Sequence, residues 1–442
     1  MEVRVLVIGS GAGTHSLVWK LLQSKRELEV ICVPGNGGIS DLAECLDIEE
    51  TDIDRLVELA IVRNINLVIV NSSKAISLGA VDRFKREGLN VFGPTKAASE
   101  IEWSKFFAKE FMFRHKIPTP QYASFNNKTL ALAYAQTIKT PAVIKANGLT
   151  EDRSGINIVK SNEEAIGVIE RLFKQKLFEK NEQRVLLEEF VEGEEISVLT
   201  ICDGSFAVSM LPAHDYPYIS DDNESTVGGM GAFAPTPLVD TQMMEQIRYK
   251  IINPTVNGLR MEGKPYTGVI AFDILVTKEG EAKLLEFNTS FGDPESQVIL
   301  PLFDEDLFEV CMASAKEDMS KFQNGFHKFP GSALAITLAS TGFPDNSHAG
   351  KLIDLSQVDQ KESIIGGQTA NVEQVLRAKP FIFHGDTKRL GSEYVTGGGK
   401  ELCATAVAES LVDAQVLAYK VADKINFEGK IYRKDIGDKG LV

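Results

Sequence analysis

Two apolar segments in the middle of the chain constrain its fold more than any other feature, because each carries polar groups on a face that should be buried. Residues 268–276 have the pattern of a buried strand with one acid, Asp273. Residues 285–288 belong to a second strand, which carries Glu286 and Asn288. The turn-forming stretch between the two strands favours a hairpin. Since side chains alternate along a strand, Glu286 and Asn288 share one face and can meet Asp273.

These three side chains predict a metal site. A buried carboxylate is costly unless a cation accompanies it. Carboxylate and amide oxygens are the ligands that Mg²⁺ and Mn²⁺ prefer. We therefore predict that Asp273, Glu286 and Asn288 hold Mg²⁺ (or Mn²⁺). The alternative is that they are ordinary solvated side chains on an edge strand.

The length and charge of the chain exclude several classes of protein. At 442 residues it exceeds one ordinary hydrophobic core, so about three or four domains are expected. The net charge of −15 disfavours nucleic acid or an anionic membrane as a partner. No apolar run is long enough to span a membrane, and the chain opens as a strand rather than a signal peptide, so a cytoplasmic location is expected. The scattered cysteines are expected to be reduced thiols, mostly in the core: Cys32, Cys45, Cys202, Cys311 and Cys403.

The order of the predicted elements suggests how the chain is organised. Strands and helices alternate through residues 1–100, which predicts a doubly wound parallel sheet. A helix over 104–118 follows and ends at Pro118, since proline cannot continue a helix. From Ser332 onward the pattern becomes rich in strands. The other predicted elements are strands at 3–8, 29–33, 67–70, 141–146, 184–188 and 333–338 and helices near 17–22 and 162–176.

Seven short segments carry a resemblance that covers nearly the whole chain. In chain order they are Val7–Gly11, Phe92–Ala98, Ser104–Lys109, Glu188–Glu195, Gly228–Ala232, Leu285–Glu295 and Tyr432–Gly437. Together they resemble the phosphoribosylamine–glycine ligase family of the ATP-grasp superfamily. The chain is identified as a divergent member of that family.

The resemblance implies a multidomain α/β (α+β) ATP-grasp fold. A Rossmann-like domain with a doubly wound parallel sheet is expected at 1–100, and the ATP-grasp domain at 101–325. Within the latter, residues 119–191 are expected to form the lid that closes over the nucleotide. A strand-rich C-terminal domain is expected at 326–442. The assembly is expected to be a monomer or a homodimer.

The resemblance also implies a reaction. Enzymes of this superfamily use ATP to phosphorylate a carboxylate, and an amine then attacks the acyl phosphate to form an amide, with release of ADP and phosphate. Protein groups mainly align the reactants and neutralise charge on the moving phosphoryl group. The implied ligands are ATP, Mg²⁺ and two small molecules, a carboxylate such as an amino acid and an amine.

Two lysines are predicted to contact the phosphates of ATP. Lys145 ends an apolar strand before a glycine-containing loop, and Lys105 starts a helix beside its positive dipole end. A solvated side chain is the alternative for either lysine. The resemblance adds Arg153 of the lid loop as a catalytic cation and Glu195 as a partner of the ribose. It also implies a hinge whose backbone binds adenine, formed by Glu188, Glu189, Phe190 and Val191.

The predicted substrate cleft departs from the family pattern. The family usually has arginine where this chain has Gly13 and Ser290, and a lysine–arginine pair is missing from residues 214–218. Proteins hold phosphate groups with charge-assisted bonds from these residue types, so the losses indicate an altered substrate. Lys74 is a nearby cation able to compensate. The cleft residues implied by the resemblance are Gly11, Ala12, Gly13, His15, Asn71, Ser72, Asp215, Tyr216, Gly229, Ser290 and Asp293.

The sequence leaves three hypotheses for the function. The first is an ATP-dependent carboxylate–amine ligase with a changed substrate, for which glycine and phosphoribosylamine should release little ADP. The second is an authentic phosphoribosylamine–glycine ligase of purine biosynthesis. The third is a non-catalytic nucleotide-binding protein. The acidic lid residues Glu151 and Asp152 favour this third hypothesis because they repel phosphate, whereas the lysines and the metal triad oppose it.

Overall fold

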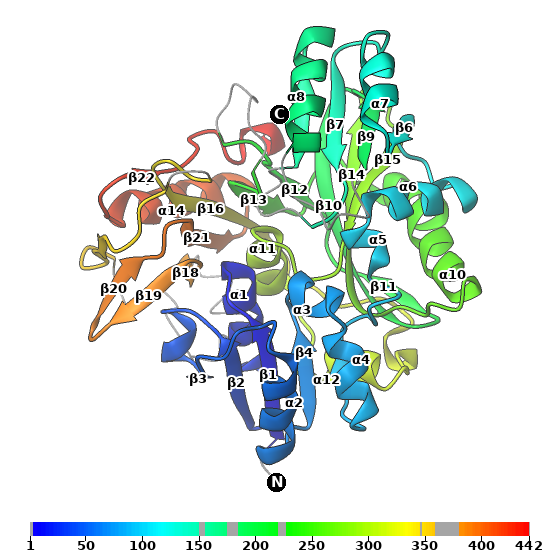
Figure 1. Cartoon of the computed structure of the whole chain (residues 1–442). Coiled ribbons are helices and arrows are strands. Elements are labelled where there is room, and N and C mark those ends of the chain that lie inside the picture. Colours follow the sequence, from blue (N-terminus) through cyan, green and yellow to red (C-terminus); the bar gives the residue numbers. More distant parts are fainter. Residues whose placement is uncertain are drawn as a thin grey trace.

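The computed structural model describes residues 3–149, 155–174, 184–219, 227–344, 347–358 and 380–441. It contains a parallel sheet at the N-terminal end, a small antiparallel sheet in the predicted lid, a long antiparallel sheet that continues into the C-terminal part, and a separate three-stranded antiparallel sheet in the C-terminal part (Figure 1). The predicted lid cation Arg153 and the lid acids Glu151 and Asp152 lie outside the described residues.

The N-terminal part forms a parallel sheet with helices on both faces. Its strands are β1 (Val3–Gly9), β2 (Leu28–Pro34), β3 (Glu44–Cys45), β4 (Leu67–Val70) and β5 (Val91–Phe92). Its helices are α1 (Ala12–Leu21), the 3-10 helix η1 (Ile39–Asp41), α2 (Ile53–Val62), α3 (Ser73–Ser77) and α4 (Ala80–Arg86). Helix α1 packs on one face and α2, α3 and α4 on the other, because side chains of β1 alternate between two hydrophobic clusters. The predicted doubly wound sheet is confirmed.

The strand order β3-β2-β1-β4-β5 reverses at the β1–β4 pair. In open α/β sheets, ligands bind in the crevice at the carboxyl ends of the strands that flank such a point. Gly9 ends β1 and Asn71 follows β4, and the Asn71 backbone N–H donates to the carbonyl of Ile8 at 2.8 Å. The loops after these two strands therefore face each other.

The predicted lid has an antiparallel sheet of its own, in the order β6-β9-β7-β8. Its elements are β6 (Tyr122–Phe125), α7 (Lys128–Ala135), β7 (Ala142–Ala146), β8 (Ile156–Val159), α8 (Asn162–Lys174) and β9 (Val185–Glu189), and they share a separate hydrophobic cluster. Before them come α5 (Glu100–Trp103) and α6 (Lys105–Arg114). Helix α6 ends before Pro118 because the chain turns at Lys116, which has a left-handed φ of 55°.

Among the described residues, a ten-stranded sheet follows the path β15-β14-β10-β12-β13-β16-β21-β18, with β11 beside β10 and β22 beside β16. Its strands are β10 (Gly193–Asp203), β11 (Ala207–Ser209), β12 (Ala213–Asp215), β13 (Gly231–Ala234), β14 (Thr267–Thr277), β15 (Ala282–Asn288), β16 (Ser332–Ser340), β18 (Pro380–His384), β21 (Lys400–Ala408) and β22 (Lys430–Ile431). Strand β13 pairs with β16, so strands on both sides of the predicted boundary at 325 share one sheet. The domain bounds stay predictions.

The remaining elements are helices and the three strands of a separate antiparallel sheet. They are α9 (Thr241–Ile247), the π-helix η3 (Arg248–Ile252), α10 (Asn253–Met261), α11 (Glu295–Leu302), α12 (Leu307–Ala315), η4 (Ser320–Phe322), β17 (Leu352–Ile353), β19 (Thr387–Leu390), β20 (Glu393–Thr396), α14 (Leu411–Lys424) and η5 (Asp438–Gly440). None of the helices in the described ranges is long and apolar enough to cross a membrane.

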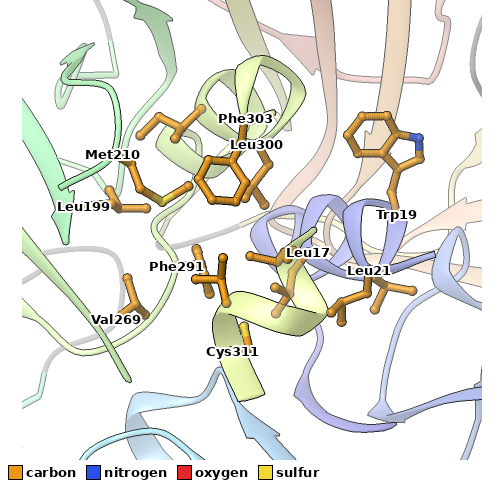
Figure 2. Close-up of a cluster of buried hydrophobic side chains, with 14 of the residues drawn as sticks. Leu17, Trp19, Leu21, Leu199, Met210, Val269, Phe291, Leu300, Phe303 and Cys311 are labelled. Carbon is orange, nitrogen blue, oxygen red and sulfur yellow. The ribbon is translucent and has the colours of Figure 1, made fainter. Parts of the chain in front are cut away.

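One hydrophobic cluster joins the N-terminal sheet to the long sheet (Figure 2). It brings Leu17 and Trp19 of α1 together with Val269 of β14 and Leu300 of α11. Phe291, from the run between β15 and α11, is buried in the same cluster. This core therefore holds the run after β15 against the N-terminal sheet.

Candidate active site

Two adjoining cavities lie where the lid sheet meets the long sheet. The inner cavity has a volume of ≈ 470 Å³ and is lined by residues of α5 and α6, by the run after β15 and by Lys400. The outer cavity has a volume of ≈ 610 Å³ and is lined by residues 188–195 and 215–218. Both cavities are bordered by Lys145, Glu188, Asp273 and Glu286.

The predicted metal ligands come together on one face of the β14–β15 hairpin. Asp273 lies directly opposite Glu286, and Asn288 lies opposite Ala271 and so points to the same face. Asp273 is 3% exposed, and the Asn288 Nδ2 group donates to its Oδ2 at 3.0 Å. A buried carboxylate beside a second carboxylate and an amide oxygen suits a hard divalent cation. The donor set therefore fits Mg²⁺.

At this hairpin, the described residues supply only part of a coordination shell. Within the ranges that the structure describes, no group of three or more His, Cys, Asp or Glu side chains could hold a metal ion. A Mg²⁺ ion here would thus depend on the Asn288 amide and on further oxygens, such as those of water and phosphate. Magnesium in nucleotide sites is commonly held in that way.

Two buried lysines share the carboxylate of Glu188. The Lys145 Nζ lies 3.3 Å from Glu188 Oε2, and the Lys109 Nζ lies 3.1 Å from the same oxygen. Although burial acts against the charged form, the Glu188 and Glu286 carboxylates raise the pKa of Lys145. Burial lowers the pKa of Lys109 to about 8. Lys109 was not predicted from the sequence, although its i, i+4 spacing from Lys105 places both lysines on one side of α6.

Lys105 lies at the start of α6, where it faces the chain that follows β7. Ser104 caps the helix by accepting a hydrogen bond from the Phe107 N–H at 3.2 Å. The Lys105 Nζ donates to the carbonyl of Gly148 at 3.3 Å, and the Phe106 N–H donates to Asn147 Oδ1 at 3.0 Å. Lys105 and Lys145, predicted as the two phosphate lysines, both line the inner cavity.

The predicted adenine and ribose residues border the outer cavity. They are Glu188, Glu189, Phe190, Val191 and Glu195. Glu189 joins the hinge to the start of the lid, because its Oε1 accepts a hydrogen bond from the Gln121 N–H at 3.0 Å. Their contacts with a nucleotide stay predictions.

Most of the predicted substrate residues border a cavity. A crevice of ≈ 230 Å³ lies at the carboxyl ends of β1 and β4. It is lined by Gly11, Gly13, Asn71, Ser72 and Asp293. The side chain of Asn71 connects two sides of this crevice. Its Nδ2 donates to Thr14 Oγ1 at 3.0 Å, and its Oδ1 accepts from the Phe291 N–H at 2.8 Å. Asp215, Gly229, Ser290 and Asp293 line the inner cavity, and Asp215 and Tyr216 line the outer one.

Two members of the predicted cleft lie elsewhere. Ala12 and His15 are buried in α1 and line none of the cavities described above. His15 Nδ1 accepts a hydrogen bond from the backbone N–H of His384, at the end of β18, at 2.8 Å. Burial lowers the pKa of His15, so the ring is neutral and links the N-terminal and C-terminal parts.

Three further charged side chains reach the inner cavity. Lys400, at the start of β21, donates through Nζ to the carbonyls of Asp293 (3.1 Å) and Gly228. Lys74 lines both the inner cavity and the crevice. Glu102 accepts hydrogen bonds from Thr289 and, at 2.7 Å, from Ser73, yet burial raises its pKa. Lys400 and Glu102 were missed in the sequence because neither lies in a segment that suggests a ligand.

Comparison with known proteins decides the family. Three models match in chain order: the phosphoribosylglycinamide synthetase N domain over residues 3–102, its ATP-grasp (A) domain over 103–296 and its C domain over 333–439. The chain belongs to the phosphoribosylglycinamide synthetase family. Membership makes it an ATP-grasp carbon–nitrogen ligase, and the resemblance seen in the sequence is confirmed.

Individual members of the family match this chain along its whole length. The phosphoribosylamine–glycine ligase of Chlorobaculum tepidum is 36% identical over 99% of this chain and 100% of its own. The crystal structure of the phosphoribosylamine–glycine ligase of Thermotoga maritima has a TM-score of 0.80 at 27% identity, covering 98% of this chain and 100% of that one.

The biotin carboxylase domain of the Hydrogenobacter thermophilus 2-oxoglutarate carboxylase is similar in fold alone. Its TM-score is 0.71 at 16% identity, over 99% of this chain and 95% of that one. The predicted ATP-grasp fold is confirmed by these neighbours.

Proposed function

We propose that the protein is an ATP-dependent phosphoribosylamine–glycine ligase. The observation that carries this proposal is the match to relatives of that name over the whole chain, at 36% identity. These relatives support the second hypothesis better than an altered substrate. A cytoplasmic location and a role in purine biosynthesis are parts of the same proposal.

In the proposed reaction a glycine carboxylate oxygen attacks the γ-phosphorus of ATP, so ADP leaves and glycyl phosphate forms. The amine nitrogen of phosphoribosylamine then attacks the carbonyl carbon, so phosphate leaves, the nitrogen loses a proton and an amide results. Lys105 and Lys145 are suited to hold the phosphates of ATP, because both lysines line the inner cavity. Asp273, Glu286 and Asn288 would hold Mg²⁺, which neutralises phosphate charge when bound.

Two lysines are placed to compensate for the arginines that are missing from the predicted substrate cleft. Gly13 and Ser290 stand where the family usually has arginine, but Lys74 and Lys400 border the space beside them. Lys400 approaches from β21, far along the chain from the other cleft residues. We propose that these two lysines meet the 5-phosphate of the sugar substrate.

An altered substrate is the second candidate. It is favoured by the change of the basic pair in residues 214–218 to a segment in which Tyr216 is buried, with its hydroxyl accepting a hydrogen bond from the Gly437 N–H at 2.9 Å. Under this candidate the chemistry is the same, but another carboxylate or amine is joined.

The test is a coupled assay of the purified protein with ATP, Mg²⁺, glycine and freshly formed phosphoribosylamine. We expect ADP and glycinamide ribonucleotide in equal amounts. The variant Lys400→Met should raise the KM for phosphoribosylamine and leave the KM for ATP unchanged. Background ADP release with this pair, together with turnover on a different amino acid or amine, would support the second candidate instead.

A further inference from the structure

The side chain of Lys109 is almost completely buried at the candidate nucleotide site. It is 2% exposed and borders the inner cavity. Its Nζ contacts Glu188 Oε2 at 3.1 Å and donates to Thr119 Oγ1 at 2.7 Å, and it lies 6.0 Å from the centre of the Tyr122 ring. Thr119 is itself held in place, because its hydroxyl donates to the carbonyl of Leu284 at 2.7 Å. The ammonium group is therefore fixed from several directions.

Glu188 is the common partner of two cations. It is 1% exposed, and its Oε2 contacts both Lys109 and Lys145. Its other oxygen, Oε1, is buried and has no hydrogen-bond partner among the described residues. A carboxylate so deeply buried is stable as an anion only while a cation stays beside it.

This arrangement is important because Lys145 is also proposed to contact the phosphates of ATP. If Lys145 were the sole partner of Glu188, moving its ammonium group to a phosphate would leave a buried carboxylate without a counter-ion, which is strongly unfavourable. With Lys109 in place, Glu188 keeps one cation when Lys145 turns toward the nucleotide. The Thr119 contact holds Lys109 on its side of the carboxylate.

We propose that Lys109 is a positioning residue, which keeps Glu188 neutralised so that the Lys145 ammonium group is available to the phosphates of ATP. The inference rests on the proposed function only in that Lys145 meets phosphate there. In this proposal Lys109 acts through Glu188 and not on a reacting atom.

The first test compares the binding of ATP and of adenosine, measured by calorimetry without the other substrates. Lys109→Met and Lys109→Gln should each weaken ATP binding by about tenfold or more, since a buried charged contact is lost. Both variants should bind adenosine as the wild type does, because adenosine has no phosphate for Lys145 to meet. Lys109→Gln keeps a partner for Thr119, so it serves if Lys109→Met does not fold.

The matched control is Lys20→Met, which removes another buried lysine that lines neither cavity. It should leave ATP binding unchanged. A loss of adenosine binding equal to the loss of ATP binding in both Lys109 variants would overturn the proposal, because it would indicate a general structural role.

A double-mutant cycle tests whether Lys109 acts through Glu188. In the Glu188→Gln background, Lys109→Gln should have little further effect on ATP binding, since no carboxylate remains to be neutralised. Additive losses would contradict the proposal. Wild-type protein that binds no ATP would overturn it together with the proposed function, whereas ATP binding without glycinamide ribonucleotide formation would count only against the latter.

Discussion

The side chain of Lys20, on α1, is 5% exposed, and its Nζ donates to the carbonyl oxygen of Phe303. Burial lowers the pKa of Lys20 to about 8, although the carboxylates of Asp304, Asp306 and Glu305 oppose the shift. The unfolded chain, in which this pKa is about 10.5, therefore binds the proton more tightly than the folded one. Each unit of difference corresponds to about 1.4 kcal/mol.

This difference predicts how stability depends on pH. The cost of burying the Lys20 charge is present in full below pH 8 and is relieved as the pH rises from about 8 toward 10.5. Relative to Lys20→Met, the wild type should thus gain free energy of unfolding between pH 7.5 and pH 10, by about 1 kcal/mol or more. Urea titrations of both proteins at the two pH values measure this, and an unchanged difference would refute it.

The hairpin carboxylates yield a second prediction for single residues. Asp273→Asn and Glu286→Gln should each lower turnover by about 100-fold or more while the protein stays folded, since each removes a charged ligand from the proposed metal site. Glu281→Gln is the matched control, because Glu281 is exposed in the turn of the same hairpin. Steady-state ADP release and circular dichroism measure the two effects. Near wild-type turnover of Asp273→Asn would leave Glu286 and Asn288 as the remaining metal candidates.

At the scale of elements, helix α6 connects local stability to the proposed phosphate site. Ser104 caps this helix and precedes Lys105, so Ser104→Ala should cost about 1 kcal/mol of stability and also raise the KM for ATP. Asp240→Ala removes the cap of α9, where Asp240 accepts from the Met243 N–H at 2.7 Å, and should lower stability alone. Thermal melts and ATP titrations separate the two variants. Equal KM values for ATP would show that the start of α6 does not position Lys105.

At the scale of the whole molecule, the N-terminal sheet is held to the long sheet by the cluster that contains Leu17 and Trp19 (Figure 2). A chain of this size often unfolds in several steps, but the shared core predicts that the N-terminal sheet does not unfold on its own. Leu17→Ala should lower the free energy of unfolding by about 2–5 kcal/mol and shift the whole calorimetric transition. A separate early transition in this variant would show that the N-terminal sheet is an independent unit.

The sequence by itself was sufficient for those features that depend on neighbouring residues. Buried runs such as 67–70 and 268–276 predict strands because their hydrophobic pattern is local. The meeting of Asp273, Glu286 and Asn288 was predictable because a short hairpin leaves little choice of register. The family was predictable because its motifs occur in order along the chain, and the models that match confirm it.

Only the tertiary structure decided which charged side chains from distant parts of the chain lie in contact. Lys109 and Lys145 meet on Glu188 from three different elements, and Lys400 reaches the inner cavity from β21. A count of cations within sequence motifs misses such residues, because Lys400 lies far along the chain from the other residues of the cavity. His15, which keeps its place in a family motif, faces His384 instead of a cavity. Side-chain partners of this kind follow from packing between layers, and no spacing along the sequence specifies that packing.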